Sequence, residues 1–138
     1  MSKYNTNLAS EFHVLSIMNR LGINAVLTLG NKKMVDIVVT SEKGDVITID
    51  VKGLAKKYDW PADNIRKPND SKHFIVLVSF EGQIDDPTFT PKAWVIPYDK
   101  IRYFIKQYKT RKNVSRALIT SRGDKYLNAW DIIIKEDN

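Results

Sequence analysis

Four charged residues in the first half of the chain have types and spacing that suit phosphate chemistry. Asp36 interrupts the apolar run Met-Val-Asp-Ile-Val-Val, and Asp50 and Lys52 lie two positions apart at the end of Val-Ile-Thr-Ile-Asp-Val-Lys. Glu11 lies upstream among apolar residues. A lone buried carboxylate is costly to keep ionised, whereas carboxylate oxygens are the ligands that hard cations such as Mg²⁺ prefer. We therefore interpret Glu11, Asp36 and Asp50 as candidate metal ligands.

A divalent metal at such a site would acidify a coordinated water and stabilise charge on a phosphoryl oxygen. The ammonium group of Lys52 would orient the attacking water or stabilise the charge of the transition state. The chemistry that uses all of these parts is metal-assisted hydrolysis of a phosphodiester, with Glu11, Asp36, Asp50 and Lys52 as the candidate catalytic residues.

Two short strands are expected to position the two aspartates and the lysine. Residues 34–39 and 46–52 are rich in β-branched residues, and the polar segment 40–45 between them contains a glycine, which is typical of a turn. Side chains alternate between the faces of a strand. Asp50 and Lys52 therefore share one face of the second strand.

A helix over residues 7–21 is expected to carry Glu11. Its apolar residues recur at helical spacing, and Gly22 follows where a C-terminal glycine is common. Glu11 falls inside this apolar arc, which makes it a candidate for the same site. The alternative is a carboxylate at the rim of the arc whose side chain reaches the solvent.

The order of helix glutamate, strand aspartate and Asp-x-Lys on the next strand resembles the PD-(D/E)XK nuclease superfamily, and the layout is most similar to its Holliday junction resolvase-like branch. The matching segments are Ser10-Glu11-Phe12, Val35-Asp36-Ile37-Val38-Val39 and Ile49-Asp50-Val51-Lys52-Gly53. The chain departs from the pattern in having Val35 rather than proline, and aspartate rather than glutamate as the second acid.

The resemblance implies an α/β fold of the restriction-endonuclease-like type, with a mixed β-sheet flanked by helices. It also implies Mg²⁺ or Mn²⁺ as the cofactor, a nucleic acid, DNA in the first instance, as the substrate, and by analogy a homodimer.

Composition agrees with a single nuclease-like domain over residues 1–138 that binds a polyanion. The formal charge of +6 and the pI near 9.5 favour nucleic acid as a partner. No apolar run approaches the ~20 residues that span a bilayer, so no membrane association is expected. The absence of cysteine is compatible with a cytoplasmic protein.

The second half of the chain shows element signals but no further catalytic motif. Residues 73–80 and 93–96 read as strands, and 73–80 is apolar enough for a central strand. The remaining expectations are an ordered loop over 53–72, a helix over 98–108 with Tyr108 in the core, a short edge strand over 117–120 and a closing helix over 125–135.

Basic and aromatic residues are the candidates for nucleic-acid contact. The stretch from Lys100 to Arg122 contains eight basic residues, Arg116 among them, and no acidic one, which suits phosphate neutralisation or, alternatively, a solvated helix face and loop. The candidate contact residues are Lys32, Lys33, Lys56, Lys57, Tyr58, Trp60, Lys106, Lys109, Arg111 and Lys112.

Other interpretations remain open on the sequence alone. Asp50 and Lys52 can form an ion pair on an exposed strand, with Asp36 beside a turn. A domain of this fold can also bind nucleic acid or regulate without cleaving it, and a protein–protein adaptor with a basic surface is a third class. A zinc site that uses His13 and His73 is disfavoured, because neither has a partner at ligand spacing.

Overall fold

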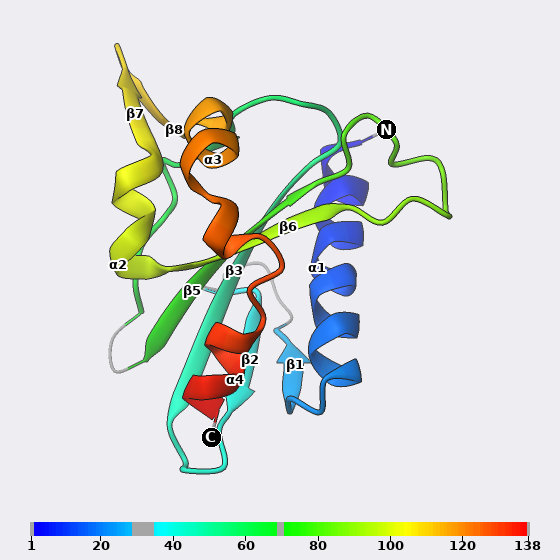
Figure 1. The fold of residues 1–138 in the computed structure, drawn as a ribbon, viewed down its shortest axis with the longest axis vertical. Helices are drawn as coiled ribbons and strands as arrows, with labels where there is room; N and C mark the ends of the chain where they lie inside the picture. Colours follow the sequence, from blue (N-terminus) through cyan, green and yellow to red (C-terminus); the bar gives the residue numbers. More distant parts are fainter. Residues whose placement is uncertain (1, 29–34, 69–70, 138) are drawn as a thin grey trace.

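A five-stranded mixed sheet forms the centre of the molecule (Figure 1). A computed structural model describes residues 2–28, 35–68 and 71–137. The strand order is β1-β2-β3-β5-β6; β3 and β5 are parallel, and the other neighbours are antiparallel. The strands are β1 (Ala25–Leu27), β2 (Ile37–Thr40), β3 (Val46–Leu54), β5 (Lys72–Ser79) and β6 (Lys92–Pro97). The predicted α/β fold with a mixed sheet flanked by helices is therefore confirmed.

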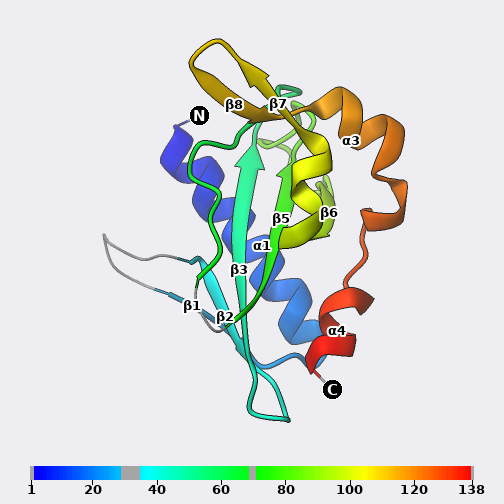
Figure 2. The same cartoon turned by 90° about the vertical axis from the view of Figure 1, so that its left-hand side faces the viewer.

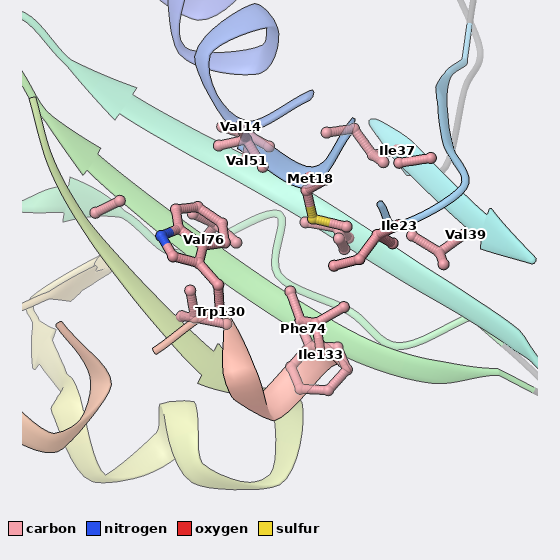
Figure 3. Packing of buried hydrophobic residues seen from close by; sticks show 14 of the residues in the cluster. Val14, Met18, Ile23, Ile37, Val39, Val51, Phe74, Val76, Trp130 and Ile133 are labelled. Carbon is pink, nitrogen blue, oxygen red and sulfur yellow. The ribbon is translucent and has the colours of Figure 1, made fainter. Parts of the chain in front are cut away.

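One face of the sheet is covered by α1 (Lys3–Arg20) and α4 (Asp131–Asp137). Figure 3 shows Met18 of α1 and Ile133 of α4 over Phe74 and Val76 of β5. Alternate residues of β3 and β5 contribute to this apolar cluster, as the period of two along a strand requires.

The other face is covered by a second apolar cluster around Trp60, Ile75 and Leu77. A small sheet of order β4-β8-β7 packs here, together with short helices. Trp60 and Trp94 meet edge to face, with ring centroids 5.8 Å apart. The elements over this face are β4 (Trp60–Pro61), α2 (Tyr98–Ile101), η1 (Arg102–Phe104), β7 (Ile105–Tyr108), β8 (Arg111–Val114), α3 (Arg116–Arg122) and η2 (Asp124–Tyr126).

The predicted β2–β3 hairpin is present. Ile37 pairs with Ile49, and Thr40 pairs with Val46. The Ser41 hydroxyl accepts a hydrogen bond of 2.9 Å from the backbone N–H of Asp45. Strand β3 continues two residues beyond the predicted end, to Leu54.

The predicted helix over 98–108 is wrong beyond Phe104. The chain leaves the helical conformation there and forms β7, in which Ile105 pairs with Val114 of β8. Tyr108, which was expected in the core, is 43% exposed. The apolar residues of 98–108 have helical spacing although they belong to two kinds of element, because the helical turns at 98–104 run directly into strand β7.

The predicted strand over 117–120 is also wrong, because these residues lie in α3. The hydroxyl of Ser115 accepts from the backbone N–H of Leu118 at 3.3 Å, and it caps the helix. The closing segment 125–135 is helical only in part, since η2 and α4 are separate elements. The predicted loop over 53–72 contains β4, which pairs with β8. Within the described ranges no helix is long and apolar enough to cross a membrane.

Candidate active site

Three of the four predicted catalytic residues line one cavity of about 550 Å³. Glu11, Asp36 and Lys52 lie in its wall, together with the segment 53–55 and β4. The cavity lies between α1 and the carboxyl-terminal end of β3. Three charged residues that are far apart in the chain therefore border the same space. Lys52 reaches it from the face of β3 opposite α1, because its register partner on β5 is Leu77, which belongs to the cluster on that face.

Asp36 is fixed at the point where β2 begins. Its backbone N–H donates to the carbonyl of Ile49 at 3.0 Å. Its carboxylate Oδ2 accepts from the backbone N–H of Val51 at 2.7 Å. In a regular sheet this N–H would donate to a backbone carbonyl of the neighbouring strand. The Asp36 side chain thereby continues the ladder along β3 and lies next to the residue that precedes Lys52.

A close contact between α1 and β3 brings Glu11 to the cavity. A Cβ atom built on Gly53 would lie 1.8 Å from Ser10 Oγ and 2.5 Å from Ser10 Cβ. Ser10 is fully buried, and its hydroxyl donates to the carbonyl of Thr6 at 2.7 Å. Only glycine at position 53 permits this approach. Glu11 is 7% exposed, so the alternative of a side chain that reaches the solvent is wrong.

Asp50 is not among the described residues that line this cavity. Its register partner on β5 is Ile75, which belongs to the cluster on the face opposite α1. Asp50 Oδ2 lies 3.3 Å from Nε2 of the buried His73, and His73 Nδ1 lies 2.8 Å from Thr48 Oγ1. The structure therefore holds Asp50 in a buried polar chain with His73, which the sequence did not indicate.

No group of three or more His, Asp or Glu side chains that could hold a metal ion occurs in the part of the chain that the structure describes. The donor chemistry of the cavity nevertheless suits magnesium. Mg²⁺ is commonly held by one or two carboxylates together with waters and substrate phosphates rather than by a cage of protein ligands. The pair Glu11 and Asp36 matches that requirement.

The predicted nucleic-acid contacts near the cavity have different outcomes. Lys56 and Lys57 are exposed, and Tyr58 is 65% exposed, just beyond the segment that lines the cavity. Trp60 is fully buried, and its Nε1 donates to the carbonyl of Val78 at 3.2 Å. Its predicted role as a contact residue is therefore wrong, because its ring packs in the core. Lys32 and Lys33 lie outside the described residues.

Arg116, which belongs to the basic run, serves inside the protein rather than at a phosphate. Its Nε donates to the carbonyl of Tyr58 at 2.8 Å, and its Nη2 donates to the carbonyl of Lys56 at 3.2 Å. The guanidinium lies over the ring of Trp60, 4.5 Å from its centroid. Arg116 thus fixes the segment that follows the cavity wall, and only the folded contacts reveal this role.

The carboxylate of Glu81 is the anionic partner of Arg116, at 3.2 Å. Burial acts to raise the pKa of Glu81. Hydrogen bonds with Ser79 and Lys92, and the charges of Arg116 and Lys92, outweigh burial and lower the pKa below its ordinary value. Glu81 is therefore ionised at neutral pH, and its ion pair with Arg116 helps to hold the guanidinium against the backbone carbonyls of Lys56 and Tyr58.

Comparison with known proteins finds a similarity of fold. No protein family and no curated protein matches the chain. A solved structure described as a bacterial homing endonuclease, I-Ssp6803I, is similar, with a TM-score of 0.60 and 18% sequence identity. The match covers 99% of this chain and 94% of that chain. The two chains therefore share a fold over essentially their whole lengths.

Proposed function

We propose that the protein is a metal-dependent endonuclease that hydrolyses phosphodiesters of nucleic acid, DNA in the first instance, through a PD-(D/E)XK-type site. The observation that carries the proposal is the placement of Glu11, Asp36 and Lys52 in the wall of one cavity. The fold shared with a homing endonuclease supports the same class of reaction.

Each of the three residues has a distinct task in this proposal. Glu11 and Asp36 hold a divalent ion, Mg²⁺ or Mn²⁺, which when bound acidifies water and stabilises charge on a phosphoryl oxygen. The hydrogen bond from the Val51 N–H fixes one oxygen of Asp36, so its carboxylate keeps one orientation. Lys52 places its ammonium group where it orients the attacking water and offsets the negative charge that develops on the phosphate.

Asp50 as a third metal ligand stays a prediction of the resemblance. The contact with His73 holds Oδ2 of its carboxylate on the side away from α1. Assembly of two copies, which the resemblance also implies, stays a prediction as well.

A cleavage assay tests the proposal. We expect purified protein with Mg²⁺ or Mn²⁺ to cut DNA, and we expect EDTA to abolish the reaction. Asp36→Asn keeps an oxygen that can accept from the Val51 N–H but removes the charge, so it should fold normally and lose cleavage. If every form of DNA and RNA stays intact with either metal, the enzymatic proposal fails.

The second candidate is a nuclease-fold module that binds nucleic acid without cutting it. The placement of Asp50 against His73, rather than in the cavity wall, favours this alternative. Its signature would be salt-sensitive binding that needs no metal and that is unchanged by Asp50→Asn.

A further inference from the structure

The hairpin of β7 and β8 carries four basic residues beyond the protein core. At its base Ile105 pairs with Val114, and Val114 is fully buried. From position 106 to position 112 every residue is exposed. Figure 2 shows the hairpin projecting at one end of the molecule. The cations along it are Lys106, Lys109, Arg111 and Lys112.

In the part of the chain that the structure describes, no carboxylate forms an ion pair with a side chain of the hairpin. The segment 105–116 contains no acidic residue. Lysines on an edge strand can serve merely to prevent aggregation. That role does not account for basic residues on both strands and in the turn. The surface is therefore complementary to a polyanion.

The hairpin is tied to the cavity through β4. Trp60 and Pro61 of β4 line the cavity, and they pair with Val114 and Asn113 of β8. The backbone N–H of Ala62 donates to the carbonyl of Lys112 at 3.0 Å. The carboxyl-terminal end of β3 points toward the same end of the molecule as the hairpin (Figure 2). A polyanion bound by the hairpin would therefore have a fixed position relative to the cavity.

We infer that the β7–β8 hairpin lies in the major groove of duplex DNA and sets the position of the phosphodiester at the cavity. The major groove of B-DNA, about 12 Å wide, admits a two-stranded β-ribbon without deformation, whereas the minor groove, about 6 Å wide, must be widened and the DNA bent to take one. By register Lys106, Tyr108 and Arg111 share one face of the hairpin, so a cationic and aromatic surface meets the groove. The inference rests on the proposed function for the cleavage step, but the binding step stands on its own.

Binding in EDTA tests the inference without any need for catalysis. The double variant Lys106→Gln/Arg111→Gln removes two charges from the hairpin. The control Arg20→Gln/Lys43→Gln removes two exposed charges from the opposite end of the molecule. Fluorescence anisotropy with a labelled duplex, over a range of salt concentrations, measures the affinity and its salt dependence.

The hairpin variant should bind the duplex roughly tenfold more weakly, and the slope of log K against log salt should fall by about two. The control should bind as the wild type does. Dimethyl sulfate should show guanine N7 atoms in the major groove protected by the wild type and not by the hairpin variant. Wild-type affinity in the hairpin variant, or protection of adenine N3 in the minor groove alone, would overturn the inference.

The outcomes separate this inference from the proposed function. If the wild type cuts DNA but the hairpin variant binds normally, the hairpin inference fails and the nuclease stands. If the hairpin variant loses binding but the wild type never cuts, the nuclease fails and the groove contact stands.

Discussion

Replacement of Lys52 by alanine should lower the rate of DNA cleavage about 10²–10³-fold, the loss that follows removal of one group that stabilises charge in a transition state. Lys52 lines the cavity with Glu11 and Asp36, and it forms no ion pair with another described side chain. Its loss should therefore leave folding intact. Single-turnover cleavage at saturating protein measures the rate, and anisotropy in EDTA measures the binding.

Lys43→Ala is the matched control for this change, because Lys43 is an exposed lysine in the turn between β2 and β3, far from the cavity. It should cut at the wild-type rate. Equal cleavage by the Lys52 and Lys43 variants would remove Lys52 from the mechanism. A parallel loss of binding and cleavage in Lys52→Ala would show that the residue binds substrate rather than acting in the chemical step.

Gly53→Ala should destabilise the protein by about 1–3 kcal/mol, the usual cost of forcing extra volume into a packed interior. The added Cβ has no room beside Ser10, so α1 must move away from β3. Glu11 moves with α1, and a displacement of about 1 Å at a catalytic group can cost on the order of 10² in rate. Urea denaturation measures the stability, and the cleavage assay measures the rate.

A double-mutant cycle isolates the contact between Gly53 and Ser10. Ser10→Gly alone should cost about 1 kcal/mol, because glycine weakens a helix interior. In Ser10→Gly/Gly53→Ala the steric conflict is gone, so the double variant should be more stable than the sum of the two single changes predicts. Strict additivity would show that the approach of α1 to β3 does not depend on this contact.

Most of the central sheet could be predicted from the sequence, because its strands carry strong local signals. The turn at 40–45 has the composition of a tight turn, and 73–80 is apolar enough to be buried on both faces. The prediction failed where a stretch of apolar residues crosses an element boundary. Residues 98–108 have helical spacing, but pairing with β8 from position 105 onward, a tertiary contact, overrides it.

The candidate site could be predicted in part, because its residues carry local signals whereas their partners lie far away in the sequence. Glu11, Asp36 and Lys52 were identified from residue type and expected face, and the structure brings them to one cavity. The partner of Asp50 could not be foreseen, because His73 lies 23 positions away on the parallel strand β5. The role of Arg116 could not be predicted either, since it depends on backbone carbonyls of a segment distant in the sequence.

The most direct measurement is anomalous X-ray scattering from a crystal soaked in Mn²⁺. The proposed mechanism predicts a manganese peak in the cavity, within coordination distance of carboxylate oxygens of both Glu11 and Asp36, with the Lys52 ammonium beside it. The peak should vanish in Asp36→Asn. A crystal that shows no manganese between these two carboxylates, or manganese only elsewhere on the protein, would contradict a metal-dependent site in this cavity.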